Sequence, residues 1–174
     1  YIQFLDSDDL LSKDKILKQV EVLQNNPNKV AICKTIKFES KVILKEELEI
    51  DTDFLYSCDN GIDFLRHLNL KDGMIQPNAF LVERKLIDSV GHFDESLTPS
   101  PDESEFFFRV ILNSNGVIFV ENEYNFYRCI QNEITLSKKK TWIAANAALR
   151  TIDKKRDLLL EIANDKISKE TIAF

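Results

Sequence analysis

The chain has 174 residues, of which 44% are hydrophobic and 30% are charged, and its net charge is −6 at pH 7. This length and hydrophobic content suffice for one domain with its own core. The negative charge disfavours nucleic acid or anionic lipid as the main partner. The printed sequence holds no signal peptide and no apolar run near 18 residues. Composition therefore agrees with a cytosolic protein.

The cysteines are three in number, scattered, and form no C-x-x-C pair. They are Cys33, Cys58 and Cys129. Odd, dispersed cysteines are typical of reduced structural residues. The sequence therefore predicts neither a disulfide framework nor a zinc site.

Residues 1–5 form an apolar strand that runs directly into the carboxylates of residues 6–9. If the chain stays extended, Asp6 and Asp8 point to the same side. Two such oxygen ligands suit Mg²⁺ or Mn²⁺, and ligand sites of open α/β sheets lie just outside strand ends. The alternative is that these residues only form a turn or cap a helix, above all Asp9.

The next segment predicts a helix that begins at Ser12 as its N-cap and ends within residues 25–28. Its apolar face carries Ile16, Leu17, Val20 and Leu23. Alternation over residues 30–38 predicts a strand with one face partly solvated. Residues 39–59 are mixed and acidic, with a short edge strand expected at residues 42–44.

The remaining elements follow from turn residues and short periodic runs. They are a helix near 61–69, a strand over 74–82 made irregular by Pro77, a helix over 84–90 closed by Gly91, a loop over 92–100, a helix over 101–113, and a strand over 117–120. Two further helical patterns follow residue 140. The aromatic residues 106–108 and Trp142 are predicted to be core residues.

The helix expected after residue 100 begins with Ser100-Pro101-Asp102-Glu103, which has the form of a capping box. In that role Glu103 bonds the backbone of Ser100 and performs no chemistry. The alternative, in which Glu103 acts as a general base, stays open and depends on the resemblance described next.

Four segments together resemble one known family. They are Phe4-Leu5-Asp6-Ser7-Asp8-Asp9, Val90-Gly91-His92-Phe93-Asp94-Glu95-Ser96-Leu97, Pro101-Asp102-Glu103-Ser104-Glu105-Phe106-Phe107-Phe108-Arg109-Val110, and Tyr127-Arg128 with Ser137 downstream. In this order and at these spacings they resemble the motifs of inverting, GT-A-type glycosyltransferases of family 2. The first corresponds to that family's Asp-x-Asp motif.

The resemblance implies an α/β fold, a partial GT-A domain with a mixed sheet flanked by helices. Residues 1–137 would be its carboxy-terminal part, without the half that binds the nucleotide base, and residues 138–174 a helical extension. The implied activity is transfer of a sugar from a nucleotide-diphosphate donor, by family habit a UDP-sugar, to a hydroxyl acceptor with inversion. Its cofactor would be Mn²⁺ or Mg²⁺.

The resemblance also assigns roles to individual residues. Asp6 and Asp8 would hold the metal and, with Arg128, the donor diphosphate, whereas Asp94 and Glu95 would line the acceptor opening. Glu103 stands where the family has its catalytic Asp, so Asp102 remains a substitute for it as the base. A second departure is that Ile130 or Gln131 replaces a family His.

The implied partners are a nucleotide-sugar and a saccharide or lipid-linked acceptor, as in polysaccharide or cell-envelope biosynthesis, and no nucleic acid. The expected location is cytoplasmic, and peripheral association with the inner face of the membrane stays open. Two other functions compete with this interpretation. One is a non-catalytic carbohydrate- or nucleotide-binding module on the same scaffold, which the two departures would favour. The other is a metal-dependent nucleotidyltransferase.

Overall fold

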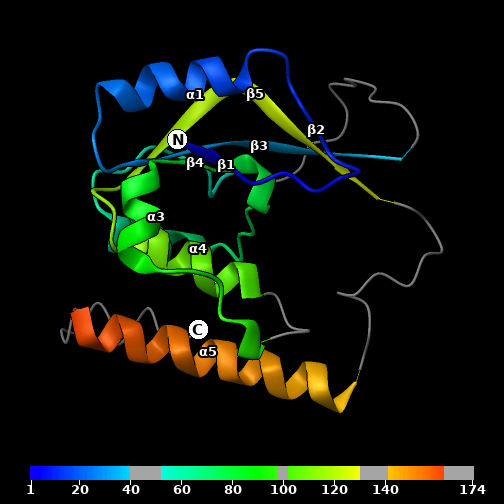
Figure 1. The fold of residues 1–174 in the computed structure, drawn as a ribbon, viewed down its shortest axis with the longest axis vertical. Coiled ribbons are helices and arrows are strands. Elements are labelled where there is room, and N and C mark those ends of the chain that lie inside the picture. The colour runs from blue at the N-terminus through cyan, green and yellow to red at the C-terminus, as the bar shows by residue number, and fades with distance from the viewer. Residues whose placement is uncertain (40–51, 98–101, 130–140, 163–174) are drawn as a thin grey trace.

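A computed structural model describes residues 1–39, 52–97, 102–129 and 141–162. Its described strands form one mixed sheet in the order β1-β4-β3-β5-β2 (Figure 1). The strands are β1 (Ile2–Gln3), β2 (Leu10–Leu11), β3 (Val30–Phe38), β4 (Leu81–Val82) and β5 (Val117–Arg128). β3 and β5 are parallel, and the other pairs are antiparallel. The expected α/β class is thus confirmed.

The chain between β1 and β2 passes from one edge of the sheet to the other within a few residues. β1 pairs with β4, whereas Leu10 of β2 pairs with Phe126 near the end of β5. Because β3 and β5 lie between these edges, residues 4–9 cross the sheet near the carboxyl end of β5. The acidic segment therefore lies at an end of the sheet.

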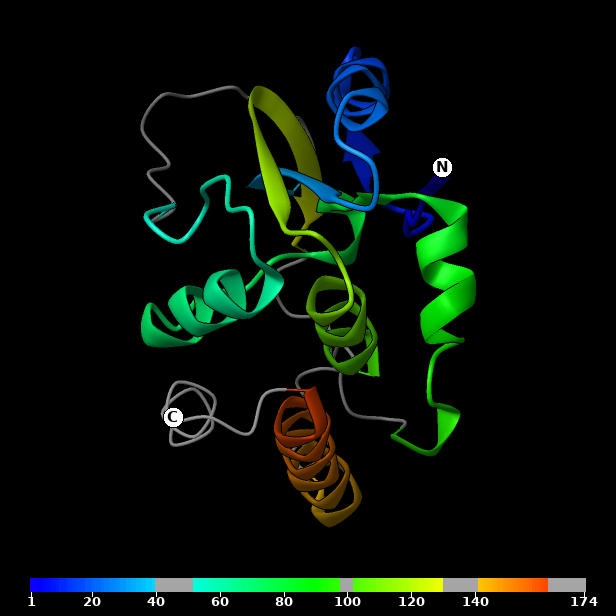
Figure 2. The same ribbon diagram turned by 90° about the vertical axis from the view of Figure 1, so that its left-hand side faces the viewer.

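Helices cover both faces of the sheet, as the two views show (Figures 1 and 2). α1 (Lys15–Gln24) packs on one face against β3 and β5. The other face is covered by α2 (Gly61–Leu70), α3 (Arg84–Val90) and α4 (Asp102–Leu112). α5 (Trp142–Ile162) packs on α4, on the side away from the sheet.

The core is divided by the sheet. Its larger part lies between the sheet and the helices α2 to α4, with Val30, Ile32 and the aromatic residues of α4 among its members. A smaller cluster of Leu23, Ala31, Leu81 and Val120 lies beneath α1. Successive residues of β3 enter opposite clusters because side chains alternate across a strand.

Several predicted elements are confirmed. β3 has the expected bounds, and its first four residues are buried. Asn60 caps α2 by accepting hydrogen bonds from the backbone N–H groups of Ile62 and Asp63. Gly91 ends α3 with φ of 81°, a left-handed conformation that favours glycine. The cysteines are free, and Phe106 is buried.

The prediction for the first helix was wrong in its start and its buried face. α1 begins at Lys15, and Ser12 instead bonds Glu123 and the backbone of Tyr124. Ile16 and Leu17 are exposed. Leu23 is buried and Val20 packs against its cluster, as predicted, but the rest of the buried stripe consists of Lys15 and Gln19. The cause is tertiary, because amide and carbonyl groups from other segments lie beneath the first turns of α1.

The strand predicted over residues 74–82 was also wrong in its extent. Pro77–Ala79 forms a 3₁₀ turn, and only Leu81–Val82 joins the sheet. Proline lacks the N–H that a ladder needs. The carbonyl oxygens of Asn78 and Ala79 are taken by the side chains of Gln3 and Gln19.

Three more expectations need correction. The two helical patterns after residue 140 form one continuous helix, α5, and Trp142 is 80% exposed rather than buried. β5 is far longer than residues 117–120. The edge strand expected at 42–44 and the domain boundary at 137 lie outside the described residues. No helix in the described ranges is long and apolar enough to span a membrane.

Candidate functional site

The acidic segment forms a turn rather than an extended strand. The backbone N–H of Asp9 donates to the carbonyl of Asp6 at 3.2 Å, and Ser7 and Asp8 occupy the turn. The condition for alternation, an extended chain, is therefore not met. The carboxylates of Asp6 and Asp8 are nevertheless both exposed. The described residues contain no group of three or more His, Cys, Asp or Glu that could hold a metal.

Asp9 behaves differently from its two neighbours because it is only 6% exposed. Its Oδ1 accepts from the backbone N–H of Arg128 at 2.8 Å, and its Oδ2 accepts from Nδ2 of Asn78 at 2.7 Å. Burial raises the pKa of Asp9 above its ordinary value, which the hydrogen bond from Arg128 opposes. Asp9 therefore ties the turn to β5 and to the 3₁₀ turn before β4.

Asn78 extends this bond into a buried polar network. Its Oδ1 accepts from Nδ2 of Asn125 at 2.5 Å, and Oδ1 of Asn125 accepts from Thr35 at 3.0 Å. The backbone carbonyl of Asn78 accepts from Nε2 of Gln3 at 2.9 Å. Asn78 and Asn125 are 2% and 0% exposed. Both amides are thus paired within the protein, as buried polar groups require.

Lys15 lies at the other end of the same network. Its ammonium donates to Oε1 of Gln3 at 2.6 Å and to Oε1 of Gln19 at 2.7 Å. Burial lowers the pKa of Lys15 to about 8, against the smaller opposing effects of Cys33 and Glu123. The network therefore runs without a break from beneath α1 to the acidic turn.

Arg128 is the last residue of β5 and lies beside the acidic turn. Its Nε donates to the carbonyl of Asp8 at 2.9 Å and its Nη1 to the carbonyl of Glu39 at 2.8 Å. The guanidinium stacks over the Phe38 ring at 4.5 Å. Burial, followed by Cys129 and the carboxylates of the turn, raises the pKa of the neighbouring Tyr127. Both residues thus border the turn.

Phe4 connects the turn to the other motif segments. Its ring lies 5.6 Å from that of Phe93, 5.6 Å from that of Phe106 and 5.5 Å from that of Phe107, in edge-on geometry. Arg109 also donates to the backbone carbonyls of Val90 and His92. The middle of α4 and the loop after α3 are therefore packed against Phe4, two residues before the acidic segment.

Glu103 is exposed in the first turn of α4. Ser100, its expected capping partner, and the side chain of Asp102 lie outside the described residues. The choice between a catalytic and a capping role therefore stays a prediction. The segment that carries Ile130 or Gln131 is likewise outside the described ranges.

Asp94 is held by α5. Its Oδ2 accepts from Nζ of Lys154 at 2.6 Å, and its Oδ1 accepts from the backbone N–H of Ser96 at 3.0 Å. The hydrogen bond from Lys154, followed by those from Ser96, holds the pKa of Asp94 well below its usual range. Arg150 adds two bonds to Ser96. Glu95 is exposed at the start of a short 3₁₀ turn, Glu95–Leu97.

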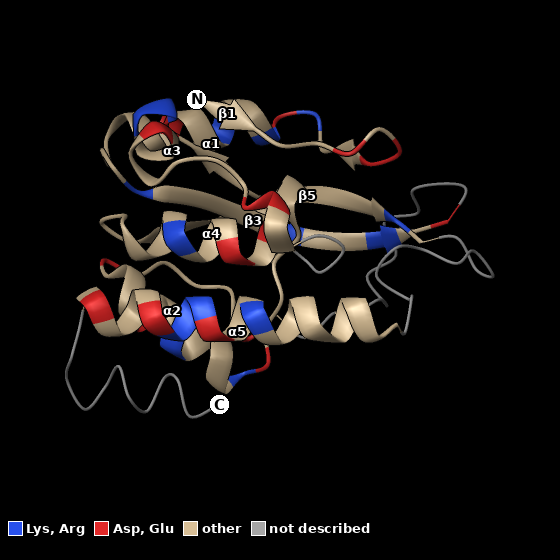
Figure 3. Cartoon of the chain, turned by 60° about the horizontal axis from the view of Figure 1, so that its bottom comes forward, with Lys and Arg blue, Asp and Glu red and all other residues tan. Residues whose placement is uncertain are grey.

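Lys154 also reaches the buried Glu105, at 3.4 Å, and Glu105 forms a two-point ion pair with Arg109. Figure 3 shows α4 and α5 side by side with charged residues on both helices. The expected acceptor loop is therefore fastened to α5 by charged hydrogen bonds.

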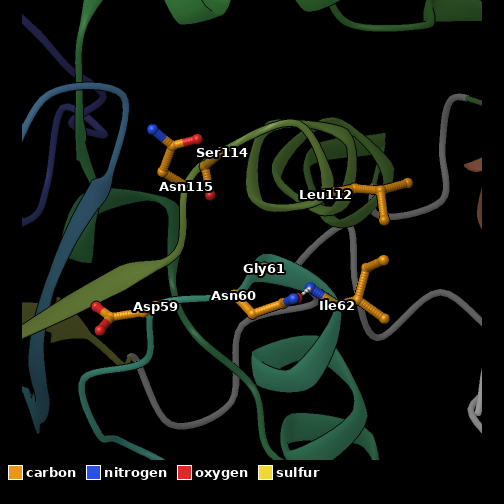
Figure 4. A pocket seen from close by; sticks show the side chains of 7 residues that line it. All are labelled: Asp59, Asn60, Gly61, Ile62, Leu112, Ser114 and Asn115. Atoms are coloured by element: carbon orange, nitrogen blue, oxygen red, sulfur yellow. Dashed lines mark hydrogen bonds between the residues drawn. The ribbon is translucent and has the colours of Figure 1, made fainter.

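A separate open hollow of about 330 Å³ lies elsewhere (Figure 4). Its lining comes from the start of α2 and the end of α4: Asp59, Asn60, Gly61, Ile62, Leu112, Ser114 and Asn115. Asn115 precedes β5, whereas the acidic turn adjoins the other end of that strand. None of the predicted site residues lines this hollow.

Sequence reasoning missed the residues that support the turn. The sequence predicts only a turn or a cap for Asp9 and gives no role to Asn78 or Lys15. A weak signal existed in Lys15 and Gln19, which share a helix face with Leu23 at four-residue spacing. Asn78 offers no such signal, because its partners are remote in sequence.

Comparison with known proteins identifies no relative of this chain. No family model, curated protein or solved structure matches the chain.

Proposed function

We propose that this chain carries the metal-binding and acceptor-side part of an inverting GT-A-type glycosyltransferase of family 2. In its complete form such a protein moves a sugar from a nucleotide-diphosphate donor, expected to be a UDP-sugar, to a hydroxyl acceptor. The proposal starts from four motif-like segments in family order. Its main structural support is that these segments touch one another.

Each of the four segments has a direct contact with another. Phe4 of the first packs on Phe93 of the second and on Phe106 of the third. Arg128 of the fourth bonds the backbone of Asp8 in the first. Residues that carry one function must meet in space, whereas chance matches along a sequence need not. Their convergence is therefore the observation that favours a common site.

The donor set fits a hard divalent cation. Asp6 and Asp8 offer exposed carboxylate oxygens on one turn, beside Arg128. Mg²⁺ typically keeps several waters and is held by one or two carboxylates together with substrate phosphates. Two carboxylates without a third protein ligand are thus sufficient. When bound, such a cation acts as a Lewis acid that neutralises the departing diphosphate.

The side chains of this chain would divide the remaining work. Glu103, or Asp102 in its place, would take the proton of the acceptor hydroxyl as that oxygen attacks the anomeric carbon. Arg128 keeps the carbonyl of Asp8 fixed and adds positive charge next to the turn. Asp94 and Glu95 belong to the loop that packs against Phe4 through Phe93, and the family resemblance would assign them to the acceptor side.

The experiment measures nucleotide release from UDP-, GDP- and TDP-sugars with Mn²⁺, using the longest natural form of the protein. We expect turnover of one donor, and its loss both in EDTA and in the Asp8→Ala variant. Asp14→Ala is the matched control, because Asp14 is an exposed aspartate of α1 without a side-chain capping bond. It should retain full turnover.

The competing functions predict other outcomes. Mn²⁺-linked nucleotide binding without turnover would favour the non-catalytic module on the same scaffold. Release of pyrophosphate from nucleoside triphosphates would favour a nucleotidyltransferase. Absence of both turnover and Mn²⁺-linked nucleotide binding would exclude the transferase.

A further inference from the structure

We propose that Asp9 and Asn78 are positioning residues that fix the turn carrying Asp6 and Asp8 in its metal-binding shape. The inference rests on the proposed function, because it concerns the same two ligands. It goes further by assigning a role to two residues outside the proposed ligand pair.

The turn is fastened by groups from three directions. Within the turn, Asp9 donates its N–H to the carbonyl of Asp6. From β5, Arg128 donates its backbone N–H to the carboxylate of Asp9 and its Nε to the carbonyl of Asp8. From the 3₁₀ turn before β4, Asn78 donates to the second oxygen of Asp9 at 2.7 Å. Both carboxylate oxygens of Asp9 are therefore used inside the protein.

Hydrogen bonds from two other residues hold Asn78 in place. Its side-chain oxygen accepts from Asn125 in the centre of the sheet, and its carbonyl accepts from Gln3. It is 2% exposed. A ligand-bearing segment is placed most accurately when its supporting hydrogen bonds end on rigid elements. Asp9 and Asn78 provide that link between the exposed turn and the buried sheet.

The alternative role for Asp9 is electrostatic, as a third negative charge near the cation. Exchange of the two side chains separates the two roles. With Asp9→Asn and Asn78→Asp together, Asn at position 9 still accepts from Arg128 and now donates to position 78. Position 78 still accepts from Asn125. The exchange therefore keeps every hydrogen bond but moves the charge away from the turn.

The test measures Mn²⁺ affinity by the electron paramagnetic resonance signal of free Mn²⁺, with the longest natural form of the protein. We expect Asn78→Ala and Asp9→Asn each to weaken binding about 10- to 100-fold, the range typical for removal of an outer supporting group. The double exchange should restore affinity to within about threefold of wild type. Asp8→Ala should abolish binding.

Thr35→Val is the stability control. It removes one bond to Asn125, from the same network, without touching Asp9 or Asn78. We expect it to lower the melting temperature while leaving Mn²⁺ affinity unchanged, which separates positioning from general stability. The double exchange also serves if Asn78→Ala does not fold.

Three results would contradict the inference in distinguishable ways. If Asp8→Ala abolishes binding but Asn78→Ala and Asp9→Asn bind as wild type, the positioning role alone is excluded. If the double exchange folds but fails to restore affinity, the charge of Asp9 is responsible instead of its geometry. If wild-type protein binds no Mn²⁺, the proposed function fails together with the inference.

Discussion

Among the described residues, Lys15 donates its side-chain hydrogen bonds to amide oxygens and not to a carboxylate, although it is completely buried. Its ammonium is held by the amide oxygens of Gln3 and Gln19. Amide dipoles offset only part of the cost of removing a charge from water, so the neutral form is favoured relative to an exposed lysine. Its pKa of about 8 follows from this burial.

The pKa of Lys15 leads to a pH prediction for stability. Between pH 8 and the model-compound value of 10.5, the unfolded chain binds more protons at this residue than the folded one. Its contribution to unfolding free energy should therefore rise with pH, by at most about 1.4 kcal/mol per pH unit. Urea unfolding at pH 7 to 10 should show this rise in wild type relative to Lys15→Met.

The comparison with Lys15→Met is needed because other groups act in the opposite sense. Burial raises the pKa of Cys33 and of Tyr56 to about 12, so their contributions fall as pH rises above their ordinary values. These contributions are shared by both proteins and largely cancel in the difference. A difference that is flat across this range would show that Lys15 titrates normally.

Glu103 can be tested by an isosteric change. If Glu103 is the general base, the Glu103→Gln variant should lower kcat about 10²- to 10⁴-fold and retain donor binding. Steady-state kinetics and nucleotide binding measure the two effects separately. The control is Glu121→Gln, which changes an exposed carboxylate of β5 and should leave kcat nearly unchanged. If Glu103→Gln lowers only the melting temperature, Glu103 is the cap, and Asp102→Asn becomes the decisive variant.

At the level of elements, α5 is joined to the loop after α3 as well as to α4. Lys154 bonds Asp94 and lies 3.4 Å from the buried Glu105, and Arg150 bonds Ser96 twice. Leu159 is 1% exposed and packs into the main core. α5 is thus part of the packed molecule, and it determines the position of the loop that carries Asp94 and Glu95.

Replacing Lys154 should loosen this attachment. Lys154→Met removes a charged hydrogen bond to Asp94 and one of the two cations next to Glu105. We expect a loss of about 1–3 kcal/mol in unfolding free energy, together with faster amide exchange in the loop after α3. The control is Arg156→Met, which breaks only exposed ion pairs of α5 and should leave the free energy of unfolding nearly unchanged. Equal losses in both variants would contradict a special role for Lys154.

At the scale of the whole molecule, Phe4 connects parts of the chain that are about 100 residues apart in sequence. It follows β1, and its ring packs on α4 and on the loop after α3. The Arg128 contact closes the arrangement from β5. The proposed site is therefore a product of the packing between the sheet edge and the helices on one face.

Truncation of Phe4 should affect stability and function together. Phe4→Ala leaves a cavity among three aromatic rings and should cost about 3 kcal/mol, measured by urea unfolding. Because the acidic turn then loses its support from the helices, Mn²⁺ affinity should fall as well. Phe4→Leu fills most of the space and should cost less than about 1.5 kcal/mol. Unchanged Mn²⁺ affinity in a folded Phe4→Ala protein would show that the turn is independent of this packing.

Much of the local structure could be predicted from residue patterns. Alternation predicted β3, turn residues and periodicity predicted α2 near residues 61–69, and Gly91 marked the end of α3. These features depend on nearest neighbours in the chain, which the sequence contains directly. Residue types gave the acidic segment as a site candidate and the family resemblance gave Arg128, and the structure places the two side by side.

Other features were decided only by tertiary structure. Lys15 and Gln19 are buried while Ile16 is exposed, because Gln3 and Ala79 present polar groups beneath α1. A 3₁₀ turn forms within residues 74–82, where a strand was predicted, and a carbonyl oxygen of this turn accepts a hydrogen bond within the same network.

The acidic turn shows most clearly how the two sources of information divide. Composition and spacing by themselves determined that a cluster of carboxylates follows the first strand. They could not determine that Asp9 turns inward, because Asn78, its partner, is 69 residues away. A buried polar side chain adopts the orientation in which its hydrogen bonds are satisfied, and only the folded chain brings those partners together.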